Sequence, residues 1–105
     1  MPSGNHDLNI AKNVKIIEWL KAEIVTSIGS LYQAMVVNSE EMIQEALATL
    51  MVSGYFLAKR VGISYEKLDE RIAQKLESPT MKEHEIEKWY GDVTSLQQYV
   101  NKRNR

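Results

Sequence analysis

The sequence predicts an all-α fold, a bundle of four helices at about residues 8–37, 39–62, 64–77 and 82–102. Apolar residues recur along the chain in steps of three, four or seven, which place them on one face of a helix. Residues that start or stop helices, such as serine, glycine and proline, fall between these periodic segments. A chain of 105 residues has room for one domain, here residues 8–105, after a flexible leader over residues 1–7.

The first helix carries one long apolar face. It consists of Ile10, Val14, Ile17, Ile24, Ile28, Leu31 and Met35. Lys21 interrupts this face, and Gly29 near its middle permits a close helix contact or a slight bend. We therefore expect this face to be the side that the helix buries.

The second helix has the clearest signals in the chain. Asn38 or Ser39 can cap its first turn, and Gly62 permits the left-handed backbone at which many helices end. From Ala46 to Ala58 there is no charged side chain. A helix that is apolar most of the way round must be covered on most sides, and a small domain has little surface to spare for this. We therefore predict a homo-oligomer, most simply a dimer.

The third and fourth helices are separated by a proline. Ser64 is a cap for the third helix and Pro79 stops it. Its buried stripe is predicted to consist of Tyr65, Leu68, Ile72 and Leu76. The core face of the last helix is predicted to consist of Ile86, Trp89 or Tyr90, Val93, Leu96 and Val100.

Acidic residues near the start of the second helix are the strongest candidates for chemistry. Glu41 and Glu45 are four residues apart, so they project from one face. Mg²⁺ takes oxygen ligands and is commonly held by one or two carboxylates together with substrate phosphates. Glu85 and Asp92, seven apart in the last helix, are further candidate ligands, and Glu23 is another contributor. The alternative is that the acidic residues of the first turn only complement the helix dipole.

Two segments resemble the motif helices of a known family. EALATLMVSGYFLAKRVGIS, which begins at Glu45, resembles the second motif helix of the MazG-like all-α nucleoside triphosphate pyrophosphohydrolases, and SIGSLYQAMV, which begins at Ser27, resembles the first. With HEIEKWYGDV, which begins at His84, the resemblance covers roughly residues 8–100. It points to the short MazG-like branch of bacteria and implies a helical bundle completed by oligomerisation.

The apolar residues of these two segments resemble the family's motif helices more closely than their acidic positions do. Glu45 occupies the Glu position of the second motif, but Ala48 occupies its Asp position. Ser27 and Ser30 occupy the acidic positions of the first motif. A hydroxyl is a neutral, weak ligand for a hard divalent ion, so most of the family's metal ligands are missing.

Two interpretations of the function remain open. In the first, the chain is a Mg²⁺-dependent enzyme that converts a nucleoside triphosphate to its monophosphate and pyrophosphate, with Glu41, Glu45 and either Asp92 or Glu85 as metal ligands. In the second, it is a catalytically inactive MazG-like helical oligomer that binds a nucleotide or a protein. Trp19, Tyr32 and Trp89 can stack a base, although aromatic residues at helical spacing more often belong to a core or an interface.

The composition narrows the classes of function. A net charge of −1 gives no footprint for nucleic acid. The absence of cysteine excludes disulfides, thiolate metal sites and a cysteine nucleophile. The longest uncharged run is far shorter than the roughly 20 residues needed to cross a bilayer. We therefore expect a cytoplasmic protein with no nucleic-acid or membrane partner.

Overall fold

Helices and the short turns between them make up the part of the chain that the structure, a computed structural model, describes. This part comprises the backbone of residues 2–103 and the side chains of residues 8–103. Within it every regular element is an α-helix, which confirms the all-α prediction. The chain divides into two compact units, Met1–Ile63 and Ser64–Arg105. That residues 8–105 form a single domain stays a prediction.

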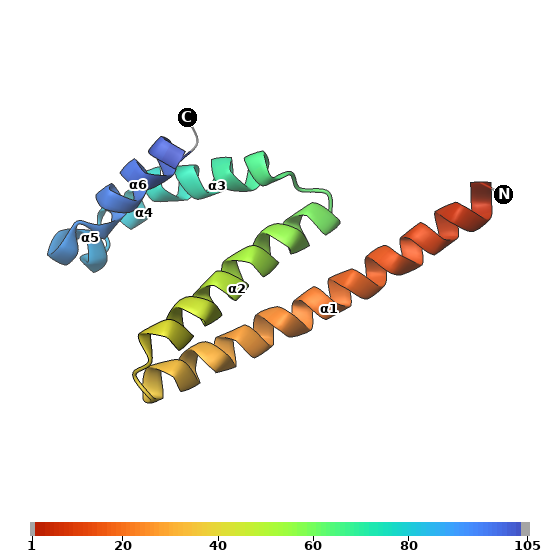
Figure 1. Cartoon of the computed structure of the whole chain (residues 1–105). Helices are drawn as coiled ribbons and strands as arrows, with labels where there is room; N and C mark the ends of the chain where they lie inside the picture. The colour runs from red at the N-terminus through yellow and green to blue at the C-terminus, as the bar shows by residue number, and fades with distance from the viewer. Residues whose placement is uncertain (1, 104–105) are drawn as a thin grey trace. The chain divides into compact units, whose positions relative to one another are not determined.

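The first unit is a helical hairpin. Its helices α1 (Pro2–Val36) and α2 (Glu40–Arg60) run antiparallel and pack along one another (Figure 1). Helix α1 begins at Pro2, whereas the sequence predicts its start at about residue 8, after a flexible leader over residues 1–7. Met1, the first residue of that leader, lies outside the described residues. The side-chain amide of Asn13 donates a hydrogen bond to the backbone oxygen of Arg60 at 3.1 Å, which joins the end of α2 to α1.

Both ends of α2 follow from the local sequence. Ser39 is the cap rather than Asn38, because its Oγ accepts a hydrogen bond from the Met42 amide at 3.3 Å. Asn38 has a φ of 55°, a conformation that asparagine adopts more readily than most residues. At the other end Gly62 has a φ of 91°, as its position predicts, and the Ile63 amide donates to the Ala58 oxygen at 2.8 Å.

A narrow seam of mostly small side chains joins α1 to α2. Its buried residues are Leu20, Ser27 and Ala34 of α1, seven residues apart, and Ala46, Ser53 and Ala58 of α2. Leu20 is the one large side chain among the described residues that is fully enclosed, at 1% exposure. Small residues at a helix contact allow the two helix axes to lie close together.

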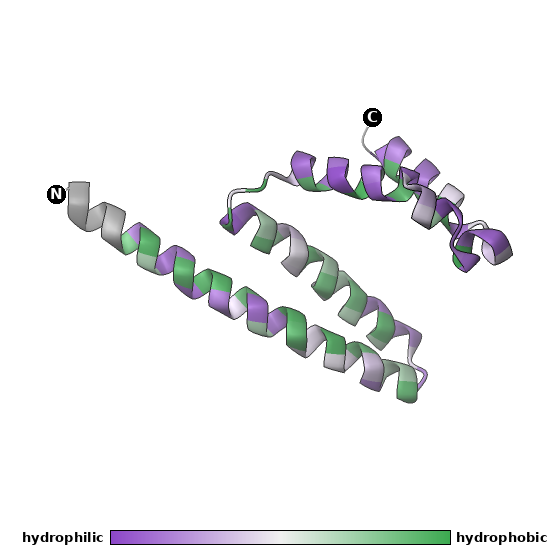
Figure 2. Ribbon diagram, turned by 180° about the vertical axis from the view of Figure 1, so that it is seen from behind, coloured by the Kyte–Doolittle hydropathy of each residue, from purple (hydrophilic) through white to green (hydrophobic). Residues whose placement is uncertain are grey.

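The apolar face predicted for α1 is only partly covered within this unit. Ile17, Ile24 and Leu31 flank the seam and are half-buried, whereas Ile10, Val14, Ile28 and Met35 are exposed. The charge-free segment of α2 has one neighbouring helix and also leaves large apolar residues exposed, namely Leu47, Met51, Val52 and Phe56. Figure 2 shows apolar residues along the length of both helices. No single helix in the described part has both the length and the hydropathy to cross a membrane, although α2 and α3 together meet those two criteria.

The second unit contains four shorter helices: α3 (Tyr65–Glu77), α4 (Pro79–Lys82), α5 (Glu85–Tyr90) and α6 (Asp92–Arg103). Ser64 caps α3, with its Oγ accepting from the Lys67 amide at 3.1 Å, and α3 ends before Pro79 as the sequence predicts. Pro79 itself opens the short helix α4, which the sequence does not predict, because proline is tolerated in the first turn of a helix. The segment predicted as one helix over residues 82–102 is divided. His84 is extended, with a ψ of 145°, and Gly91 is left-handed, with a φ of 69°. Neither backbone conformation can continue a helix.

The core of the second unit lies between α3 and α6. It consists of Leu76, Val93 and Val100, with Ile72 and Met81 packed against it. The burial of Val93 and Val100 agrees with the sequence prediction. The prediction that either Trp89 or Tyr90 belongs to the core is wrong, because the two residues, in the separate short helix α5, are 68% and 74% exposed. Ile86 and Leu96, also predicted for the core face, are exposed as well.

A side-chain cap stabilises the start of α6. The Glu87 carboxylate accepts a hydrogen bond from the Thr94 amide at 3.0 Å and another from the Thr94 hydroxyl. These two bonds, of which the bond from the hydroxyl has the larger effect, lower the pKa of Glu87 from its ordinary value of 4.5. The charged carboxylate also lies beside the positive end of the helix dipole.

The seam predicts a large effect for Leu20→Ala. Removing a fully buried leucine side chain costs the transfer free energy and leaves a cavity, together about 2–5 kcal/mol. Chemical denaturation followed by circular dichroism should therefore show a lower unfolding midpoint. Val25→Ala is the matched control on the same helix, because Val25 is 69% exposed. Equal effects of the two changes would contradict the packing of α1 on α2.

The Glu87 cap predicts a dependence of stability on pH. The pKa of Glu87 is lower in the folded state than in the unfolded state, so the charged carboxylate stabilises the fold. This stabilisation is fully present above about pH 4.5 and is lost as the pH falls through the folded-state pKa. Glu87→Gln should lower the melting temperature at about pH 6, and the difference from wild type should shrink at about pH 3. Glu83→Gln is the control, because Glu83 is an exposed glutamate four residues earlier in the chain, outside α5. A difference that stays constant with pH would contradict the charged cap.

Candidate functional site

A cavity of about 300 Å³ opens on one side of the hairpin, between α1 and α2. Its lining residues are Trp19 and Glu23 of α1 and Glu45, Ala48, Thr49, Val52, Ser53 and Phe56 of α2. Pockets that bind small molecules begin at about this volume. The cavity combines two carboxylates, two aromatic rings and two hydroxyls, which is a donor set suited to a polar ligand with a flat apolar part.

Helical spacing places these residues in an ordered row. In α1, Trp19 and Glu23 are four residues apart and share one face. In α2, Glu45 and Phe56 lie on one face through steps of four, three and four residues. Because the helices are antiparallel, Glu23 and Glu45 both lie on the side of the cavity nearer the α1–α2 turn. Trp19 and Phe56 lie on the side nearer the open end of the hairpin.

The structure places Glu45 and Glu23 on the lining of one cavity, and that Glu41 and Glu45 hold a metal ion stays a prediction. Glu41 is exposed one turn before Glu45 and is not among the lining residues. Sequence reasoning treated Glu23 only as a further contributor, and it did not identify Phe56. The four-residue spacing of Trp19 and Glu23 indicates that they share a face of one helix. That this face lines a cavity with Glu45 follows only from the register in which the two antiparallel helices pair.

Three positions of the acidic motifs hold side chains that cannot bind a metal ion strongly. Ser27 is 4% exposed and forms part of the seam. Ser30 is exposed on α1 and does not line the cavity. Ala48 does line it and presents only a methyl group. The cavity therefore keeps the Glu of the second motif and has Glu23 as its second carboxylate.

The two acidic candidates of the last predicted helix lie in the second unit. Asp92 lines a separate, mainly apolar cavity of about 300 Å³ with His84 and Leu76 among its neighbours. Glu85 is exposed in the first turn of α5, whereas Asp92 belongs to the first turn of α6. The two-turn spacing expected within one helix does not apply, because Gly91 separates them. That Asp92 or Glu85 joins Glu41 and Glu45 stays a prediction.

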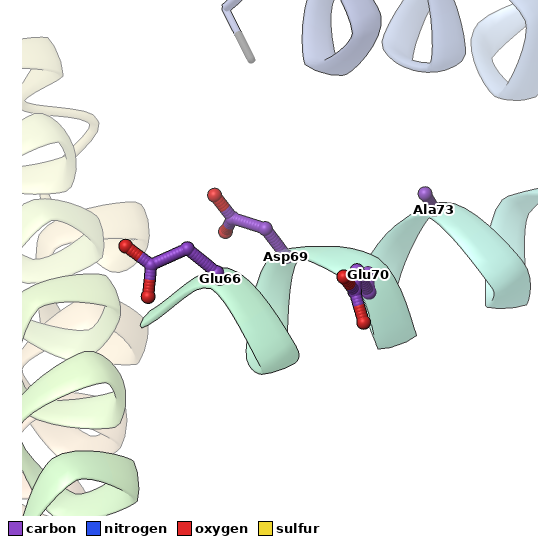
Figure 3. A pocket seen from close by; sticks show the side chains of 4 residues that line it. All are labelled: Glu66, Asp69, Glu70 and Ala73. Carbon is purple, nitrogen blue, oxygen red and sulfur yellow. The ribbon is translucent and has the colours of Figure 1, made fainter. Parts of the chain in front are cut away.

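An acidic face on α3 is a competing site. Glu66, Asp69 and Glu70 line a hollow of about 320 Å³ with Ala73, and Figure 3 shows the carboxylates of Glu66 and Asp69 on one side of the helix. Asp69 accepts a hydrogen bond from the Arg103 guanidinium at 3.5 Å, which compensates part of the negative charge. All the lining residues of this hollow come from one helix, whereas the α1–α2 cavity combines side chains of two helices and adds aromatic rings to its carboxylates.

The donor set of the α1–α2 cavity fits a weakly held hard cation. Among the described residues there is no group of three or more His, Cys, Asp or Glu side chains arranged to hold a metal ion. Two carboxylates are nevertheless the number that commonly holds Mg²⁺ when the remaining ligands are phosphate oxygens and water. Glu23 and Glu45 thus suit an ion that arrives with a polyphosphate.

Comparison with known proteins gives one match. A model of the MazG-like family matches residues 10–93, which include nearly all of the hairpin, all of α3 to α5 and the first residues of α6. No curated protein and no solved structure matches the chain significantly.

Proposed function

Because the chain belongs to the MazG-like family, we propose that it binds a nucleoside triphosphate in the α1–α2 cavity and hydrolyses it to the monophosphate and pyrophosphate. The observation that carries this proposal is the joint placement of Glu23 and Glu45 beside Trp19 and Phe56. Carboxylates hold the cation of a metal–triphosphate complex, and aromatic rings stack on a base. A nucleotide needs both features in one cavity.

The residues of the cavity have distinct roles in this proposal. Glu23 and Glu45 would hold Mg²⁺, which supplies positive charge to the triphosphate and activates a water molecule. Trp19 and Phe56 would contact the two edges or faces of the base, since they come from opposite helices. The hydroxyl of Thr49 lies between these groups along α2 and can donate a hydrogen bond to the ribose or a phosphate, whereas Ser53 is buried in the seam.

A second candidate function is nucleotide binding without hydrolysis. Ser27 and Ala48 favour it, because they place a hydroxyl and a methyl group at positions where the resembled motifs have acidic residues. Two carboxylates can hold one ion through the phosphates. Hydrolysis also requires that the attacking water be oriented, and fewer carboxylates leave fewer groups for that task.

Glu23→Gln and Glu45→Gln should each weaken Mg²⁺-dependent binding of a non-hydrolysable nucleoside triphosphate. Each change removes a negative charge while keeping the shape, and the expected loss is about 10- to 100-fold in affinity. Isothermal titration of metal alone, nucleotide alone and both together measures it. Glu41→Gln is the matched control, since Glu41 lies one turn from Glu45 outside the cavity.

The same titration separates the alternatives. Binding that depends on both carboxylates, together with release of pyrophosphate from a hydrolysable triphosphate, supports the enzyme. Binding without pyrophosphate release supports the second candidate. An unchanged affinity in Glu23→Gln and Glu45→Gln would overturn the placement of the site.

Self-association is part of the same proposal. The side of the hairpin away from the cavity exposes Ile28 and Met35 of α1, at 41% and 58%, and Leu47 and Met51 of α2, at 43% and 56%. Several large exposed apolar side chains on two neighbouring helices are typical of a surface that another protein covers. We propose that a second copy of the chain covers it, so that two hairpins form a four-helix bundle.

Ile28→Glu combined with Met51→Glu should convert the oligomer to a monomer. The two charges would be buried without partners in the interface, which costs several kcal/mol. Light scattering coupled to size-exclusion chromatography measures the mass. Ala22→Glu, which adds a charge on the exposed opposite side of α1, should leave the mass unchanged. A monomeric wild-type protein would refute the proposed interface.

A further inference from the structure

The α1–α2 cavity carries charge of one sign only. Its charged lining residues are Glu23 and Glu45, and no Lys, Arg or His is among the residues that line it. Neither carboxylate forms an ion pair with another side chain in the described part of the chain. A cavity lined by one sign of charge attracts ligands of the opposite sign. In the absence of a metal ion, this cavity therefore favours a cation.

The aromatic side chains of the cavity favour the same kind of ligand. Trp19 and Phe56 line it from opposite helices and are 58% and 50% exposed. Neither takes part in the ring or cation–π contacts formed among the described residues, which leaves both rings open to a ligand. The face of an aromatic ring is negative and attracts a cation, and tryptophan does so most strongly.

Basic residues near the cavity do not change this balance. Lys15 and Arg60 are each four residues from a ring residue, Trp19 and Phe56 respectively, but both are exposed and neither lines the cavity. Charges at the surface act through water, which weakens and screens them. Glu23, by contrast, is half-buried in the lining itself. Its charge therefore acts on a ligand more directly.

The shape of the cavity narrows the class of cation. Two aromatic residues on opposite helices can contact a planar ligand on two sides, whereas a tetrahedral ammonium group has no flat face for a ring to stack on. A nucleobase is planar, but the common bases are neutral at neutral pH. They would use the rings and leave the negative potential of the cavity without effect. A base that is both planar and positively charged uses both.

We propose that the α1–α2 cavity selects nucleotides whose base carries a positive charge, such as a purine methylated at a ring nitrogen. This inference rests on the proposed function, because it takes the position of the base at Trp19 and Phe56 from it. Mg²⁺ at Glu23 and Glu45 would compensate the carboxylates, so with the metal bound the preference comes mainly from the two rings. Without the metal, the carboxylates add to it.

The test compares two nucleosides that differ only in where a methyl group is attached. At neutral pH 1-methyladenosine is a cation, whereas N6-methyladenosine has the same atoms and is neutral. Isothermal titration of the full chain without a metal ion should give at least about tenfold higher affinity for 1-methyladenosine. Neither nucleoside has a phosphate, so the comparison does not depend on Mg²⁺ binding.

Variants assign the preference to the cavity. Trp19→Leu keeps an apolar side chain and removes the ring, so the ratio of the two affinities should fall to near one. Glu23→Gln should lower the ratio as well, because it removes half of the negative charge of the cavity. Trp89→Leu is the matched control, since Trp89 is an exposed tryptophan in the second unit, and it should leave the ratio unchanged. Circular dichroism checks that each variant keeps its helices.

Several results would overturn the inference. These are equal affinities for the two nucleosides, no measurable binding of 1-methyladenosine, and a ratio that survives Trp19→Leu. Binding of tetramethylammonium as tight as that of 1-methyladenosine would refute the preference for a planar base.

The proposed function fails in a different way. If nucleoside triphosphates bind with Mg²⁺ but the two nucleosides bind equally, only the preference for a cationic base is refuted. If 1-methyladenosine is preferred but no triphosphate binds with Mg²⁺, the proposed function is refuted, and the cavity is a site for the cationic base alone.

Discussion

The close packing of α1 on α2 through small side chains is the constraint on which the cavity depends. Ser27, Ala34, Ala46 and Ser53 occupy most of the seam, so the helix axes can lie near one another. The residues beside the seam are then brought within reach across the helix pair. Glu23 and Glu45 belong to one cavity for this reason, although 22 positions separate them in the sequence.

The same seam explains why one acidic motif position cannot simply be restored. Ser27 is 4% exposed, and a carboxylate at that position would be buried at a cost of several kcal/mol unless a cation compensated it. A serine fills the space and needs no counter-ion. The seam therefore packs without a metal ion, whereas Glu23 and Glu45 are not buried and need no counter-ion when no metal is bound.

The fold could be predicted from the sequence where local chemistry decides it. Ser39, Gly62 and Ser64 set the ends of α2 and α3 through caps that act within a few residues. The segment over residues 82–102 could not be predicted in this way. Its apolar residues keep a helical spacing through His84 and Gly91, whereas the backbone leaves the helical conformation at both residues. Glycine at position 91 was a visible signal, but whether a glycine is tolerated within a helix or ends it depends on tertiary contacts such as the bond between Glu87 and Thr94.

The site required the pairing of helices, which composition does not reveal. Glu45 could be identified from its position in one helix. Glu23 and Phe56 can be recognised as residues of the same cavity only when α1 is placed antiparallel to α2. The distribution of charged side chains likewise depends on how the helices pair. A net charge of −1 indicates no basic surface for the chain as a whole, yet helical spacing collects Lys12, Lys15 and Arg60 at one end of one side and the carboxylates toward the other. Because screening limits the reach of exposed charges to about 10 Å, the local order of charge decides which ligand a surface favours.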